Sequence, residues 1–437
     1  MPPELTENPL EVSDRILATG EIIESFNRVT NKVSELDEGI SIVESFSHVI
    51  SFDTGDELVC FDSSGAMTGT AVVEALRSWS EKPVHSMVYT HGHVDHTGGS
   101  GAFAADADSR GHEAPQVVAH EGVRHRLDRY ELTNGWNNAI NRRQFGGVAP
   151  SENLGIGGMG ARFLPEDALW PTVEYTASHE LAVGDHTFEL FHDRGETDDH
   201  TWAWVPQHKA LCVGDFVTWV FPNCGNPQKV QRFPAEWAVA LRKMMAYDAE
   251  WLFGAHGLPV RGAVNVNRIL EDLALALEKL VGDTLEMMNA NESLDSILHT
   301  VALPPEMIKP WMIPVYDEPE FVVRNIWRQY GGWWDLNPAN LKPAPESAVA
   351  EELSALIGGS SKLVERAQEL AAVGDLKLAC HLIEIAAKAD PSGQAMHEAR
   401  AAIYQQRRDT ELSLMSKGIF AAAANESAKE LESKEEG

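Results

Sequence analysis

The stretch MVYTHGHVDHTGG, residues 87–99, decides the fold of this chain. It begins as an apolar run and then places four side chains of metal-ligand type within six positions, at His91, His93, Asp95 and His96. Alternate residues of an extended segment share one face, so His91 and His93 can reach one ion together. The turn that follows directs Asp95 and His96 towards a second position. The alternative, a solvated polar loop behind a strand, rarely combines these residue types at this spacing.

Four residues cannot complete two metal sites, so further donors must come from other strand ends. Three later stretches, DRGETDDHTW (193–202), LCVGD (211–215) and LFGAHG (252–257), contain the candidates Glu196, Asp198, Asp199, His200, Asp215 and His256. A buried carboxylate or imidazole is costly unless it meets a partner. Taken singly, Asp215 is typical of a helix cap and His256 of a hydrogen-bonded core imidazole. Because both follow the first cluster in this order, we predict that both are metal ligands.

The composition excludes several classes of partner. Acidic residues number 66 and basic residues 35, so the net charge of the 437-residue chain is −31. This excess repels nucleic acid and anionic membranes, and an anionic substrate would need locally placed Arg or Lys side chains. The first residues lack the pattern of a signal peptide, no apolar run is long enough to span a bilayer, and the four cysteines are scattered. We therefore expect a cytoplasmic protein without membrane insertion and without nucleic acid.

Strand-like and helical stretches alternate over the first half of the chain, which predicts an α/β layered domain. From about residue 264 the pattern is helical, with one apolar stripe over 267–281 and two helices over 361–391. The glycine-rich stretch 153–163 is interpreted as a mobile connection or pocket lip. The expected strands are 57–64, 86–91, 115–120, 186–193, 202–206, 209–215 and 250–257, with a helix at 70–80 after the first of them.

Two resemblances follow from these motifs. The series HxHxDH, a Gly-Glu-Thr turn, a strand ending in Gly-Asp and a strand ending in Gly-x-His-Gly resembles the metallo-β-lactamase superfamily. The stretch YGGWWDLNPANLKPAP (330–345), followed by the helical hairpin, resembles the dimerisation domain of the alkylsulfatase branch. Together they imply an αββα sandwich over residues 1–265, an all-α dimerisation domain over 266–425 and a homodimer. We expect the remaining tail, 426–437, to be disordered.

The first resemblance also implies a ligand set for two divalent metal ions, expected to be zinc, although iron and manganese accept the same donors. One metal would be held by His91, His93 and Glu196, the other by Asp95, His96 and His256, with Asp215 bridging both. A histidine is usual where Glu196 stands, and a glutamate there resembles the alkylsulfatases. His200, four residues on, is the rival third ligand; otherwise it would orient a ligand or transfer a proton. Asp95 and His200 are the predicted catalytic residues.

Hydrolysis of an ester-like bond follows from such a site, and the resemblance implies a small alkyl sulfate ester, anionic with an apolar tail. The segment after the bridging acid supplies the predicted substrate contacts Trp219, Asn223, Lys229 and Arg232. Lys229 and Arg232 could bind a sulfate by charge-assisted hydrogen bonds or form a solvated helix face.

The leaving group raises an alternative, because alkylsulfatases carry histidines in this segment and residues 216–233 contain none. The required acid would then be His200, Tyr89 or a metal-bound water. A lactone, carboxylic ester or thioester substrate therefore stays open, as does, more remotely, a non-catalytic dimeric metal-binding scaffold. The aromatic stretches 309–321 and 333–335 could line an acyl pocket, although a core or subunit interface is their more common position.

Overall fold

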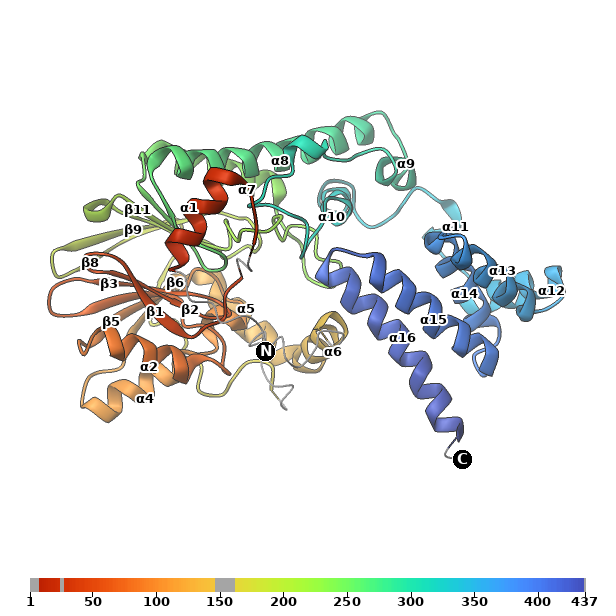
Figure 1. The fold of residues 1–437 in the computed structure, drawn as a ribbon, viewed down its shortest axis with the longest axis horizontal. Coiled ribbons are helices and arrows are strands. Elements are labelled where there is room, and N and C mark those ends of the chain that lie inside the picture. Colours follow the sequence, from red (N-terminus) through yellow and green to blue (C-terminus); the bar gives the residue numbers. More distant parts are fainter. Residues whose placement is uncertain (1–7, 24–26, 146–161, 436–437) are drawn as a thin grey trace. The chain divides into compact units, whose positions relative to one another are not determined.

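The structure is a computed structural model that describes residues 8–23, 27–145 and 162–435 (Figure 1). The chain divides into two compact units. The sandwich unit contains the described parts of residues 1–138, 153–292 and 296–331, and the helical unit those of 139–152, 293–295 and 332–437.

The sandwich unit is built on two sheets. The first has seven strands in sequence order, antiparallel from β1 to β4 and parallel from β4 to β7. The second has six strands in the order β13-β12-β11-β10-β9-β8, of which only β11 and β12 are parallel. The strands are β1 (Lys32–Asp37), β2 (Ile40–Glu44), β3 (Val49–Asp53), β4 (Leu58–Phe61), β5 (Val84–Val88), β6 (Gln116–His120), β7 (Val173–Tyr175), β8 (Ser178–Val183), β9 (His186–His192), β10 (Thr201–Val205), β11 (Ala210–Gly214), β12 (Trp251–Gly254) and β13 (Val260–Arg261).

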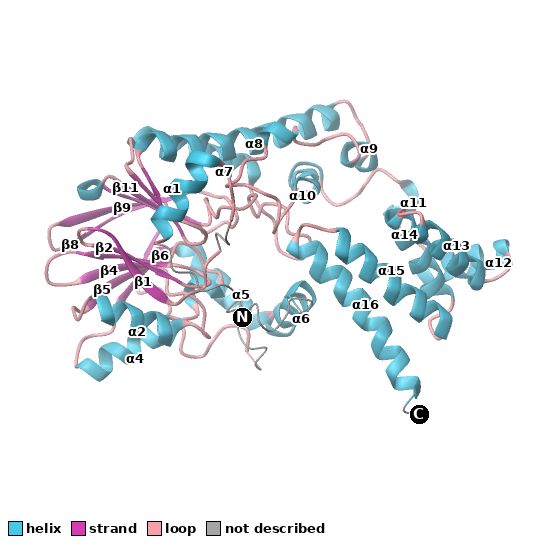
Figure 2. Cartoon of the chain, viewed as in Figure 1, coloured by secondary structure: helices cyan, strands magenta, loops and turns pink. Residues whose placement is uncertain are grey.

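Helices cover the outer faces of both sheets (Figure 2). The first sheet packs on α2 (Gly69–Trp79), α4 (Ser100–Arg110) and α5 (Glu121–Leu132) through an apolar cluster. The second lies beside α1 (Pro9–Thr19), α7 (Pro234–Met244) and α8 (Ala263–Asn289). A separate core fills the space between the sheets, where Phe52 and Phe188 meet edge to face at 5.5 Å. These four layers confirm the predicted αββα sandwich.

The remaining elements of the chain are short connections and the helices of the C-terminal half. They are α3 (Val94–Thr97), α6 (Asn134–Phe145), η1 (Pro206–His208), η2 (Met245–Tyr247), α9 (Leu294–Leu298), η3 (Pro305–Met307), α10 (Pro319–Gly331), α11 (Pro338–Leu341), α12 (Glu346–Ile357), α13 (Ser360–Ala372), α14 (Leu376–Ala389), α15 (Gln394–Thr410) and α16 (Leu414–Glu435). The predicted hairpin is α13–α14: Gly374 takes a positive φ of 84°, and the Asp375 side chain caps α14 by accepting from Leu378 N–H.

Two expectations about domain limits differ from the structure. The compact sandwich unit does not end near residue 265, because α8 and α10 pack within it, up to residue 331. The tail from residue 426 was expected to be disordered, but it forms the last part of α16, which ends at Glu435. Residues 153–161 of the glycine-rich stretch lie outside the described residues.

Candidate metal centre

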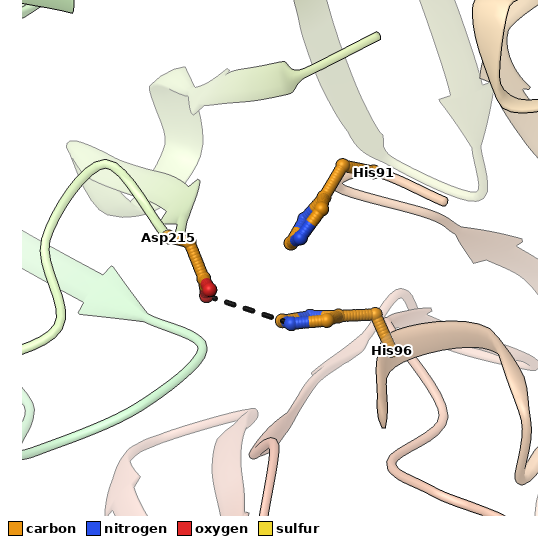
Figure 3. A group of neighbouring side chains, drawn as sticks. All are labelled: His91, His96 and Asp215. Carbon is orange, nitrogen blue, oxygen red and sulfur yellow. Dashed lines mark ion pairs between the residues drawn. The ribbon is translucent and has the colours of Figure 1, made fainter. Parts of the chain in front are cut away.

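Parallel strands end at the same edge of a sheet, and this edge collects the predicted ligands. His91 follows β5, Asp215 directly follows β11, and His256 lies two residues beyond β12. The one-turn helix α3 carries the next donors of the first cluster. Figure 3 shows His91, His96 and Asp215 converging from these different elements, and one possible ligand atom from each lies within 4.8 Å of the others.

The first donor group consists of His91, His93 and Glu196. The two Glu196 oxygens lie 3.8 Å from His91 Nε2 and 3.7 Å from His93 Nδ1, and these nitrogens are 2.8 Å apart. Ligands about 2.1 Å from a tetrahedral zinc ion lie roughly 3.4 Å from one another. The three side chains are therefore spaced for one shared cation.

The second donor group consists of Asp95, His96 and His256. Asp95 Oδ2 lies 3.5 Å from the Nε2 atoms of both His96 and His256. Asp215 Oδ1 lies 3.6 Å from His96 Nε2 and 3.5 Å from His256 Nε2, so it adjoins this group as well as His91. All seven predicted ligands thus gather at one edge of the sandwich.

Unpartnered atoms point to what this centre binds. In the described part of the chain, His96 Nε2, Glu196 Oε2 and Asp215 Oδ1 are buried and have no hydrogen-bond partner. Buried polar atoms are almost always paired, so three such atoms in one cluster indicate a missing partner. Each belongs to a donor type that binds zinc, and the residues present therefore fit divalent cations.

The protonation states of the two donor groups differ. Although burial opposes their charged forms, Asp215 and Asp95 raise the pKa values of His96 and His256, which favours their protonation while no cation is bound. Burial lowers the pKa values of His91 and His93 well below the usual range; the neighbouring histidines add to this at His91, and Arg232 and Arg126 add to it at His93. Their lone pairs are therefore free at neutral pH.

Burial also raises the pKa of Glu196, and the nearby Asp215 raises it further. Burial opposes ionisation of Asp215 too, but His256 and His96 outweigh it and lower its pKa. Carboxylates this close disfavour each other's ionisation, and added positive charge would favour the charged form of both.

Asp62 supports the centre from behind and was missed by the sequence analysis. Its Oδ2 lies 2.8 Å from His96 Nδ1, and the carboxylate also accepts hydrogen bonds from Thr90 N–H and the Thr90 hydroxyl. A carboxylate on the far nitrogen orients a ligating imidazole. The signal was available, since Asp62 directly follows the apolar strand β4 just as Asp215 follows β11.

His200 lies behind His91 rather than between the two donor groups. Its Nε2 is 3.0 Å from His91 Nδ1, and its ring packs on Phe216. Burial lowers the pKa of His200 to about 3. This placement suits the orientation of His91 and not protonation of a leaving group. As a rival ligand it shares a cluster with His91 and Glu196, while Glu196 lies 3.8 Å from His91 and 3.7 Å from His93.

The other two candidates of the 193–202 stretch hold the backbone of the histidine segment. Asp199 accepts from Gly92 N–H at 3.1 Å and from Arg126 Nε at 2.7 Å, while Asp198 pairs with the second arm of Arg126. Both Asp199 and Arg126 are buried. These acids therefore position the metal ligands and do not belong to either donor group.

The predicted substrate contacts divide into two kinds. Trp219 is 1 % exposed and its indole N–H donates to Leu258 O at 2.7 Å, so it packs behind the His256 turn and does not face a substrate. Asn223 and Arg232 both bind Glu196: the Asn223 amide donates to Oε1, and Arg232 Nη1 lies 2.9 Å from the same atom.

The two cations of this segment also differ from each other. Arg232 is buried, so the alternative of a solvated helix face is wrong for this residue. Lys229 is half-buried, and burial and Arg232 lower its pKa to about 8.

Two tyrosines affect which side chains could donate a proton or a hydrogen bond at the centre: one is excluded and one is added. Tyr89 is buried and donates to Leu169 O at 2.9 Å, which removes it as a leaving-group acid. Tyr316 was missed, although the aromatic stretch that contains it was noted. Burial raises the pKa of Tyr316, and the carboxylates of Glu196 and Asp95 raise it further, which places this phenol beside the centre.

One side of the centre is open. The side chains of His93, Asp95 and His256 are 17 %, 22 % and 15 % exposed, whereas those of His91 and His96 are fully buried. A substrate would approach from this side. No helix among the described residues is long and apolar enough to cross a membrane.

Replacing Asp62 by Asn should weaken metal binding at the second donor group. The amide cannot accept all three hydrogen bonds, and loss of such an outer partner costs about 10–100-fold in metal affinity. Competition with a chromophoric chelator measures this, with Asp53→Asn as the control because Asp53 pairs only with surface groups such as Lys82. Equal affinities of D62N and the wild type would contradict the role of Asp62.

Asp199 should make stability depend on pH. Burial opposes its ionisation, but Arg126 outweighs this and lowers the pKa to about 2. A lowered pKa gives stability that is complete above the ordinary value near 4 and is lost as pH falls towards 2, here about 2 kcal/mol. Urea unfolding between about pH 6 and pH 2 should show the gap between the wild type and Asp199→Asn shrinking below about pH 4. A constant gap would refute this linkage.

The comparisons with known proteins agree with this geometry. Residues 44–256 match the family model of the metallo-beta-lactamase superfamily, and residues 293–430 match that of alkyl sulfatase dimerisation. A linear primary-alkylsulfatase from Pseudomonas sp. is 26 % identical over 409 residues, covering 91 % of this chain and 74 % of the relative. The alkyl/aryl-sulfatase BDS1 of Saccharomyces cerevisiae is 26 % identical over 336 residues, covering 73 % of this chain and 51 % of the relative.

A solved structure shows the same fold over most of the chain. A double mutant of the sec-alkyl sulfatase PisA1 superposes with a TM-score of 0.80 at 22 % identity, covering 91 % of this chain and 65 % of that one. The chain spans only about half the length of several curated alkylsulfatases that it matches. Residues 44–256 thus belong to the metallo-β-lactamase superfamily, and residues 293–430 carry an alkyl sulfatase dimerisation domain.

Proposed function

We propose that this protein is a metal-dependent hydrolase that uses two divalent cations, zinc in the first place, to cleave an alkyl sulfate ester. The observation that carries the proposal is the convergence of two donor groups beside Asp215, with three buried atoms that have no hydrogen-bond partner. The alkylsulfatase names of its relatives support the choice of substrate. Iron or manganese would use the same donors.

When bound, the cations would lower the pKa of a water molecule and accept negative charge that develops on the substrate. The chain's own residues prepare the remaining steps. Although burial disfavours its charged form, His96 and His256 lower the pKa of Asp95, which is therefore ionised at neutral pH. On the open side of the centre, this carboxylate can accept a hydrogen bond from the attacking water and hold it in place.

The anionic end of a sulfate ester needs local positive charge, because the whole chain carries −31. Lys229 stays mostly protonated at pH 7, since its pKa is about 8, and Arg232 is permanently charged. Tyr316 keeps its proton because its pKa is raised, so it can donate a hydrogen bond. We infer that these three groups surround the sulfate, with Arg232 also holding Glu196.

Four free cysteines, three of them buried, support a reduced, cytoplasmic environment.

His93→Ala should abolish hydrolysis of dodecyl sulfate. Loss of a direct ligand should reduce the rate by more than the roughly 10–100-fold typical of outer partners. Inorganic sulfate release and metal content are measured together, with His85→Gln as the control because His85 bonds only to the Ser86 hydroxyl among the described side chains. Turnover by H93A without metal would refute the metal mechanism. Turnover of lactones, carboxylic esters or thioesters with no sulfate release would refute the proposed substrate.

We also propose that the helical unit forms a homodimer through the apolar face of α12. This face is solvent-exposed in the single chain and lies within the region matched by the dimerisation family. Its residues follow helical spacing and are Val349, Leu353, Leu356 and Ile357, which are 48 %, 39 %, 80 % and 39 % exposed.

Leu356→Glu should shift the protein towards the monomer, because a buried interface cannot accept an unpaired carboxylate. Analytical ultracentrifugation at micromolar concentration measures the change. Val373→Glu is the matched control: Val373 is 79 % exposed but follows α13, away from this face. A dimer that survives L356E, or a monomeric wild type, would exclude α12 as the interface.

A further inference from the structure

We infer that Asp317 is a positioning residue for the metal centre: it holds residues 221–232, the Asn223 loop, so that Asn223 and Arg232 stay on Glu196. The inference deepens the proposed function and rests on it. Asp317 lies in the sandwich unit, far along the chain from every predicted ligand.

The orientation of Glu196 depends on the Asn223 loop. Asn223 donates to Glu196 Oε1, while Arg232 Nη1 lies 2.9 Å from this oxygen and 2.5 Å from the Glu196 backbone carbonyl. These contacts leave Glu196 Oε2 3.8 Å from His91 Nε2 and without a hydrogen-bond partner, while Oε1 lies 3.7 Å from His93 Nδ1. Any movement of the loop would therefore move the third ligand of the first donor group.

The Asn223 loop contains no helix or strand, so it needs support from elsewhere. The Asp317 carboxylate accepts from Gly225 N–H at 2.6 Å, and Ile313 O accepts from Phe221 N–H at 3.0 Å. The Asn325 amide donates to Cys224 O at 2.8 Å and to Arg232 O at 2.9 Å. Several points along the loop are thus bound by one short segment, residues 313–325.

Both carboxylate oxygens of Asp317 accept hydrogen bonds. One oxygen binds Gly225 and the other accepts from Glu318 N–H at 2.7 Å, while the side chain is completely buried. Burial raises the pKa of Asp317 to about 7, against the effect of both backbone donors and Arg232. A buried acid is costly unless its hydrogen bonds stabilise something, and here they tie the loop to its support.

Gly225 is the point of closest approach between the loop and its support. A Cβ atom there would lie 2.2 Å from the backbone carbon of Phe321 and 2.2 Å from Val322 N. The two backbones therefore pack directly on each other, with no room for a side chain. This close packing explains why a single carboxylate at Asp317 can set the position of the loop.

Residues 313–325 therefore have a second role. Residues 293–430 match the dimerisation family, yet 313–325 folds with the sandwich unit and supports its metal centre. The geometry of Glu196 therefore depends on chain that follows the last strand, β13, by more than fifty residues.

Asp317→Asn in the full chain tests the inference, because an amide cannot accept from both backbone N–H groups through two oxygens. In metal-free protein, hydrogen exchange of peptides covering 221–232 should become at least about 10-fold faster, with β5 and β11 unchanged. In reconstituted protein, metal affinity at the first donor group should fall by about 10-fold. Asn325→Ala, which removes the other support, should reproduce both effects and stands in if D317N does not fold.

Glu320→Gln is the control, since Glu320 is an exposed residue of α10 that pairs with Arg324. Unchanged exchange and unchanged metal affinity in both D317N and N325A would overturn the inference. Faster exchange throughout the sandwich unit would also overturn it, because Asp317 would then support stability in general. Wild-type protein that binds no metal would instead refute the proposed function and leave the exchange result intact.

Discussion

The structure depends on one electrostatic constraint: three carboxylates and four imidazoles share a small, largely buried volume at the edge of two sheets. Glu196 is 1 % exposed and Asp215 6 %, and their carboxyl groups adjoin one another. Removing such groups from water costs several kcal/mol each unless opposite charge compensates. Part of this charge comes from the side chains: Arg232 lies 2.9 Å from Glu196, and the carboxylates raise the pKa values of His96 and His256. Divalent cations would take over this compensation at the histidines, which would couple metal binding to the protonation and folding of the edge.

Much of the surrounding structure holds the ligands in one arrangement. Asp62 fixes His96, His200 fixes His91, and Asp199 holds the backbone between the first two histidines. Glu196 is fixed by the loop that follows the bridging acid. These supporting residues come from different strand ends and helices. The rigidity of the centre therefore depends on the contacts between the two sheets. This explains why a sandwich with a dense aromatic core lies directly behind it.

The net charge of the whole chain is opposite in sign to that of two side chains beside the metal centre. The chain as a whole is strongly acidic, yet Arg232 and Lys229 lie beside the centre, where the field of the carboxylates is offset locally. Trp333, which is 70 % exposed in the helical unit, stays a candidate for contacts with apolar partners.

The sequence by itself determined the fold class and predicted the seven donor side chains that gather at the edge of the sandwich, because both depend on local patterns. Donors at fixed offsets after apolar strands identify the edge of a sandwich, and helical spacing identifies the C-terminal hairpin. The sequence could not separate Glu196 from His200, since both follow the same turn and only the fold directs one to the histidines and the other behind them.

The roles of other residues were decided by the tertiary structure alone. The sequence could not show that Trp219, a predicted substrate contact, and Tyr89, one of three possible acids, are buried, because burial depends on what packs over a residue, which a single segment does not contain. Asp62, Tyr316 and Asp317 went unassigned because their partners lie in distant segments of the chain. Local pattern therefore predicts which donor groups come together, whereas long-range packing decides which groups hold them in place.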